Sequence, residues 1–201
     1  MKLFTAVLLA LFSHSLFASQ LSGKDISAAF DAALVEASVS IDKDSIIAWQ
    51  SEVDDHEVEV KILNEHDVKL TYGCHQHLPN PAMVCHEEFV GQGNNHQHKD
   101  ADITFDFVQK GHTAAVTKFE KTMKRRGKDL SILSAVKVWI HEDDHGGGHG
   151  HDHGPDVWTK LNYELDGTAS AIFVICHVHG HDDHFSCHYS NTGEEEPTLD
   201  F

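Results

Sequence analysis

The segment CHQHLPNPAMVCH, residues 74–86, recurs 102 positions later as CHVHGHDDHFSCH, residues 176–188. Both copies follow the pattern C-H-x-H-x7-C-H, so the same Cys and His positions recur at the same spacing. Such an agreement is improbable by chance, and a self-match at a fixed offset is the sequence signature of a repeated structural unit. The chain is therefore expected to contain an internal duplication.

The hydrophobic pattern around each copy also repeats. Apolar residues at helical spacing predict a helix over Asp25–Ser38 and a second over His112–Arg126, with Gly127 as its stop. Alternating apolar residues predict strands in both halves: Val58–Ile62, Val68–Tyr72, Leu161–Leu165 and Ala171–Ile175. The apolar stretches Ile46–Trp49 and Val136–Trp139 follow the two predicted helices in matching positions. Thr104–Phe107 resembles the chain end Thr198–Phe201 and is expected to close the first half. We predict an internally duplicated α+β fold, each half packing one helix on a four- to five-stranded antiparallel sheet with a disulfide-pinned hairpin.

Three parts of the chain are expected: a signal peptide at residues 1–18, a first α+β repeat at 19–108 and a second at 109–201. The second carries a His-rich loop insertion at 141–156. A basic start, a short apolar run and a small residue at Ala18 are typical of a secretory signal. The run is too short to span a bilayer. We expect cleavage near Ala18, a periplasmic or secreted protein, and no membrane insertion.

Charge and composition narrow the class of partner. The 201 residues include 15 Lys and Arg against 32 Asp and Glu, for a formal charge of −17. Nucleic acids and anionic membranes are polyanions, so neither is an expected partner. The 19 His residues stand out, because histidine is the commonest metal ligand in proteins. The composition therefore favours divalent metal ions.

The four cysteines admit three arrangements. An oxidising compartment and an even number of cysteines favour a disulfide within each hairpin, Cys74–Cys85 and Cys176–Cys187. The alternatives are two structural zinc sites with thiolate and imidazole ligands, or disulfides exchanged between the halves.

Within-hairpin disulfides would gather the histidines on the opposite face of each hairpin, because strand side chains alternate between faces. If Cys74 and Cys85 are cross-strand partners, then His75, His77 and His86 share one face within reach of a single ion. The same reasoning assigns His177, His179 and His188 to a second three-His site with an open fourth position. The alternative is that both His-x-His pairs mark a solvated strand face.

The His-rich insertion offers further metal ligands. Glycines separate its histidines, so they can close on one ion without a preformed site. The candidate ligands there are His145, His149, His151 and His153. Imidazole with carboxylate suits Zn²⁺, Cu²⁺, Ni²⁺ and Co²⁺, and zinc is the default choice on availability. The single histidines His56, His66 and His112 are expected to be structural or solvent-facing.

The pattern of cysteines and histidines is consistent with three functions. The leading one is an extracytoplasmic divalent-metal binding protein that acts as a buffer, scavenger or chaperone and passes metal to a transporter or receptor. The second is a metal-dependent hydrolytic or lyase-type enzyme, with Glu87, Glu88, Asp182 or Asp183 as base. The sequence contains no H-E-x-x-H, no G-x-S-x-G and no P-loop motif, so an enzyme is the less favoured interpretation. The third is a disulfide-stabilised interaction or inhibitor module.

Overall fold

The computed structural model describes residues 21–54, 57–77, 80–92, 103–141, 155–178 and 184–190. Each half runs as one helix followed by four strands. The first half comprises α1 (Gly23–Ala37), β1 (Ile46–Asp54), β2 (Glu57–Asn64), β3 (Val68–His77) and β4 (Asn80–Gln92). The second comprises α2 (Phe105–Arg125), β5 (Leu133–His141), β6 (Asp156–Leu165), β7 (Thr168–Val178) and β8 (Phe185–Ser190). Short 3₁₀ turns, Lys43–Ser45 and Leu130–Ile132, lead into β1 and β5.

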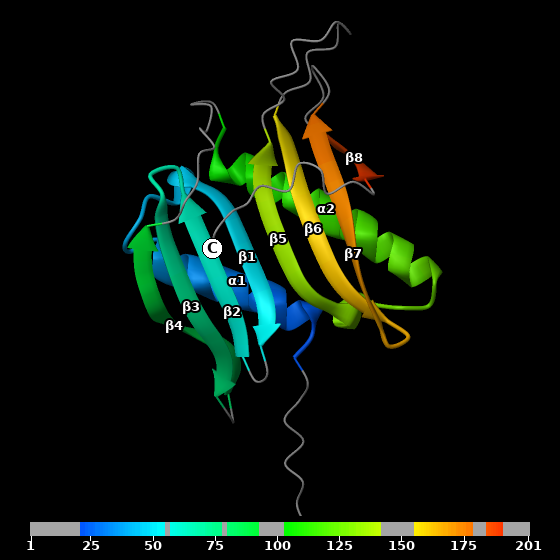
Figure 1. Ribbon diagram of the computed structural model, residues 1–201, viewed down its shortest axis with the longest axis horizontal. Helices are drawn as coiled ribbons and strands as arrows, with labels where there is room; N and C mark the ends of the chain where they lie inside the picture. The colour runs from blue at the N-terminus through cyan, green and yellow to red at the C-terminus, as the bar shows by residue number, and fades with distance from the viewer. Residues whose placement is uncertain are drawn as a thin grey trace, which may run out of the picture.

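The eight strands form one antiparallel sheet in the order β4-β3-β2-β1-β5-β6-β7-β8 (Figure 1). The sequence predicted one helix on a four- to five-stranded antiparallel sheet in each half; the structure has four strands in each half, and the two sets are continuous in a single sheet. Strands β1 and β5 pair with each other, from Ala48 opposite Trp139 to Glu52 opposite Ala135. Left apart, each of these strands would present a row of unpaired backbone groups at a sheet edge. Their pairing satisfies those groups and joins the two halves.

Both helices cover the same face of this sheet, α1 behind β1–β4 and α2 mainly behind β5–β8 (Figure 1). The predicted apolar face of α1 is buried, including Ile26, Phe30 and Ala33. Phe30 stacks on Trp49 of β1 with ring centroids 4.7 Å apart, and Phe105 at the start of α2 packs against the same indole at 5.6 Å. The core therefore lies between the helices and the sheet.

Helix α2 begins at Phe105, seven residues before the predicted start at His112. The Thr104 hydroxyl accepts a hydrogen bond from the backbone N–H of Phe107 (3.3 Å), which caps the helix. Thr104–Phe107, which was expected to end the first repeat, therefore forms the start of the second helix. This helix begins before residue 109, where the second repeat was expected to start. The predicted stop is confirmed, since Gly127 takes a positive φ of 72° just after the helix.

No helix in the described ranges combines the length and the apolar character that crossing a bilayer requires.

Candidate metal centre

The first hairpin is pinned by a disulfide between Cys74 of β3 and Cys85 of β4, as predicted. The two residues are direct cross-strand partners. Their sulfur atoms lie 3.6 and 3.4 Å from the carbonyl oxygen of Ala29, so this disulfide faces α1. Gln76 shares that face and donates a hydrogen bond to Asp25 of α1 (3.1 Å). The neighbouring side chains of β3 consequently point to the face that carries no described helix.

Three histidines meet on that open face. His75 and His77 alternate with Cys74 and Gln76 along β3, and His86 of β4 stands opposite Gly73. One ring nitrogen from each imidazole lies within 4.8 Å of the other two. The ring centroids are 4.6 Å apart for His75 and His77, 5.2 Å for His75 and His86, and 6.2 Å for His77 and His86. The predicted first triad is therefore a real spatial cluster.

The geometry of this cluster suits one metal ion. Zinc binds imidazole nitrogen at about 2.0–2.1 Å, which places two such nitrogens about 3.3 Å apart around a tetrahedral ion. Nε2 of His75 and Nε2 of His77 already lie 3.1 Å apart. His77 and His86 are exposed and His75 is half-buried, so an ion reaches the cluster directly from solvent.

Two carboxylates border the same cluster at Gly73. A Cβ atom added to this glycine would lie 2.6 Å from Oε1 of Glu88 and 3.0 Å from Oε2 of Glu57. Because Gly73 has no side chain, both carboxylates can lie close to it, and Gly73 is the residue that stands opposite His86. Neither carboxylate belongs to the close group of three imidazoles, so both lie next to the candidate ligands and not among them.

Glu87, the other suggested base in this hairpin, points to the opposite face. It pairs with Tyr72, a buried residue on the helix side. Burial, with the negative charges of Glu87 and Glu36, raises the pKa of the Tyr72 phenol to about 12. Glu87 therefore lies away from the three imidazoles.

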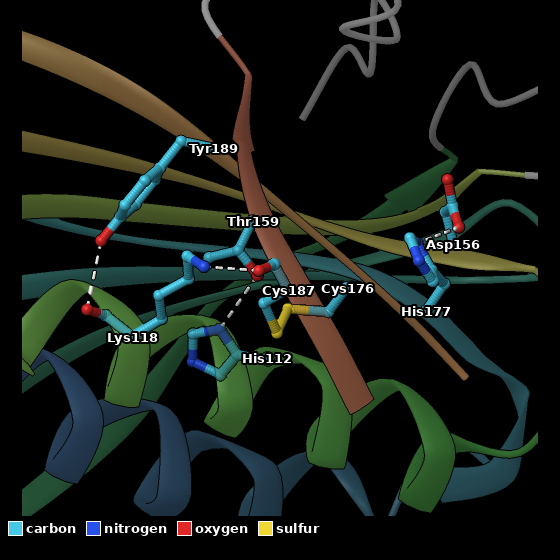
Figure 2. Close-up of a disulfide and its surroundings, with 8 residues drawn as sticks. All are labelled: His112, Lys118, Asp156, Thr159, Cys176, His177, Cys187 and Tyr189. Carbon is cyan, nitrogen blue, oxygen red and sulfur yellow. Dashed lines mark hydrogen bonds and ion pairs between the residues drawn. A yellow bond between two sulfur atoms is a disulfide. The ribbon is translucent and has the colours of Figure 1, made fainter. Parts of the chain in front are cut away.

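The second hairpin is also closed by its predicted disulfide, Cys176–Cys187, and all four cysteines are accounted for. On the side of α2, the ammonium group of Lys118 donates a hydrogen bond to the carbonyl oxygen of Cys187 (2.5 Å), drawn in Figure 2. Tyr189 in turn donates to the carbonyl oxygen of Lys118 (3.1 Å). These contacts fasten β8 to the helix.

The metal-ligand candidates of this hairpin are arranged differently from those of the first. His177 and His188 lie with ring centroids 5.4 Å apart. Nδ1 of His177 is 3.4 Å from Oδ1 of Asp156, the first residue of β6 (Figure 2). His179 lies outside the described residues, and so do Asp182 and Asp183. The described part of this hairpin therefore shows a His–Asp pair with a second imidazole nearby.

The two hairpins lie at opposite ends of the sheet, because β3 and β7 run in opposite directions (Figure 1). The four histidines His145, His149, His151 and His153 lie outside the described residues. The strands on either side of this insertion are β5 and β6, which pair as far as His141 and Asp156, next to the second hairpin. One ion consequently cannot be shared by the two hairpins.

His112 plays a structural role, as expected for an isolated histidine. Its Nδ1 lies 3.4 Å from the hydroxyl of Thr159, and its ring meets Trp49 edge-on at 5.5 Å. Burial lowers the pKa of this imidazole to about 4, so it is neutral at neutral pH.

Comparisons with known proteins add no relative. No family model, no curated protein and no solved structure matches this chain. The functional argument therefore rests on the geometry of the site.

Proposed function

We propose that this protein binds a divalent metal ion, with zinc as the first choice, through His75, His77 and His86, and acts as an extracytoplasmic buffer, scavenger or chaperone. One observation carries the proposal: three imidazoles from two disulfide-linked strands offer nitrogens within 4.8 Å of one another. Three imidazoles suit zinc and also copper, nickel and cobalt. The ion is cargo in this account, and a metal transporter or receptor would receive it.

The two disulfides support a location outside the cytoplasm. Disulfides persist in oxidising compartments and are rare where thiols are kept reduced. A removable signal at residues 1–18 would bring the chain there. That segment lies outside the described residues, so its role is part of the proposal.

The second hairpin and the His-rich insertion would add metal capacity at the other end of the sheet. His177 and His188 would be joined there by His179 and by the insertion's His145, His149, His151 and His153. Asp156 supports this arrangement, because a carboxylate beside one ring nitrogen of His177 can orient the imidazole, as carboxylates commonly do at metal sites.

Deleting residues 145–154 should lower the number of zinc ions bound per chain while the tightest site keeps its affinity. The reason is that the first hairpin lies at the other end of the sheet and loses no ligand. Titration of the full chain and the deletion variant against a chromophoric chelator measures both quantities. If the tightest site disappears with the deletion, the insertion and not the first hairpin holds the metal.

Metal-dependent hydrolysis is a second candidate, favoured by the carboxylates of Glu57 and Glu88 beside Gly73, the residue that stands opposite His86. Three imidazoles can leave one zinc position for water, and a nearby carboxylate can accept its proton. Zinc-dependent hydrolysis of an activated ester, reduced in Glu88→Gln while zinc stays bound, would favour this function over storage.

A further inference from the structure

A cavity of about 300 Å³ lies between the two helices and the middle of the sheet. Its floor consists of Trp49 and Ser51 of β1 and Val136 of β5, at the point where the two halves join. Residues of α1 and α2 form its walls. The volume lies at the lower end of the range for small-molecule sites, about 300 to 1,000 Å³.

The lining of this cavity combines apolar side chains with polar ones, among them Gln109, Thr113 and Thr117 of α2. Ile26 and Phe30 contribute from α1, Val116 from α2, and Leu133 from β5. Apolar surface of this kind favours an apolar body, which leaves water when it enters.

Ser51 is the polar exception on the floor. It is 1% exposed, and its hydroxyl has no hydrogen-bond partner among the described residues. A buried hydroxyl is normally hydrogen-bonded, and it can both donate and accept. Its position on the cavity floor makes it the natural partner for one polar group on a ligand.

The charges around the cavity exclude an anion. None of the described residues that line it is Lys or Arg, and Asp31 lies among them. His112, which also lines it, is neutral at neutral pH because burial lowers its pKa to about 4. A ligand carboxylate would therefore lose its hydration without gaining a cation.

We propose that this cavity binds a small uncharged molecule with an apolar ring and one hydroxyl group, which hydrogen-bonds to Ser51. The cavity lies on the helix-covered face of the sheet, whereas the three imidazoles occupy the other face. This second binding function is consequently independent of the metal proposal, and its test needs no metal.

Phenol and toluene are matched probes, because they share the ring and differ by the hydroxyl. Isothermal titration of the full chain should show saturable binding of both, with phenol tighter by about tenfold. Benzoate, with the same ring and a negative charge, should bind at least about tenfold more weakly than phenol.

Ser51→Ala should abolish the preference for phenol while toluene still binds. The same variant should melt at a higher temperature without ligand, because it removes a buried hydroxyl that lacks a partner. A residue with a merely structural role would give the opposite change in melting temperature. Val116→Phe should fill the cavity and abolish binding of both probes, and Ser170→Ala on β7 is the matched control that should behave as the wild type.

Three results would overturn the proposal. They are no saturable binding of either probe to the wild-type chain, equal affinities for phenol and toluene, and an undiminished phenol preference in Ser51→Ala. Since Ser51→Ala is expected to fold at least as well as the wild type, the test does not depend on Val116→Phe being stable.

Discussion

Replacing His75 with alanine should weaken the tightest zinc binding by more than about 100-fold, or about 2.7 kcal/mol. His75 is the central member of the cluster, with its ring closest to both others. Without it, His77 and His86 remain, with centroids 6.2 Å apart and one ligand fewer for the ion. Competition with a chromophoric chelator at neutral pH measures the change.

Two further alanine variants serve as controls. His66 lies in the turn between β2 and β3 with 73% of its side chain exposed, so His66→Ala should leave the tightest site unchanged. His177→Ala should reduce the number of ions bound and spare the tightest site, because its hairpin lies at the other end of the sheet. Equal losses in His75→Ala and His66→Ala would show that the binding is not specific to the cluster.

Acidification should destabilise the protein through His112, by up to about 3 kcal/mol between pH 6.5 and pH 4. An unfolded histidine takes up a proton near pH 6.5, whereas burial lowers the pKa of this one to about 4. The folded state therefore binds fewer protons in that window. The stability contributed by the neutral ring is complete above pH 6.5 and declines as the pH falls toward 4.

The variant that isolates this effect is His112→Phe combined with Thr159→Val. It removes both hydrogen-bond partners together and leaves neither buried polar group alone. Urea unfolding of the metal-free protein at pH 7 and pH 4.5 should give a smaller stability difference for the double variant than for the wild type. The same difference in both proteins would mean that other groups account for the acid sensitivity.

The features that the sequence predicted correctly depend on neighbours within one hairpin. Alternation along a strand placed Cys74 and His75 on opposite faces, and the predicted disulfide made Cys85 the cross-strand partner of Cys74. Those two local rules are sufficient for the first three-His cluster, because all its members lie on two adjacent strands. The buried side of α1 could also be predicted, because apolar residues at helical spacing define it directly.

The features that the sequence did not reveal depend on how one strand pairs with another. Glu57 lies on the polar side of β2, yet its approach to Gly73 follows from the pairing of β2 with β3. The contact between His177 and Asp156 similarly depends on the pairing of β6 with β7. The pairing of β1 with β5 joins residues that lie more than 80 positions apart in the sequence. Local periodicity carries no information about such partners.

The most direct test of the metal site is an anomalous diffraction map at the zinc edge, from crystals of the full chain with one equivalent of zinc. The account predicts a single strong peak about 2.0–2.1 Å from one ring nitrogen of each of His75, His77 and His86. A peak at the second hairpin or the His-rich insertion, with none between these three imidazoles, would contradict it.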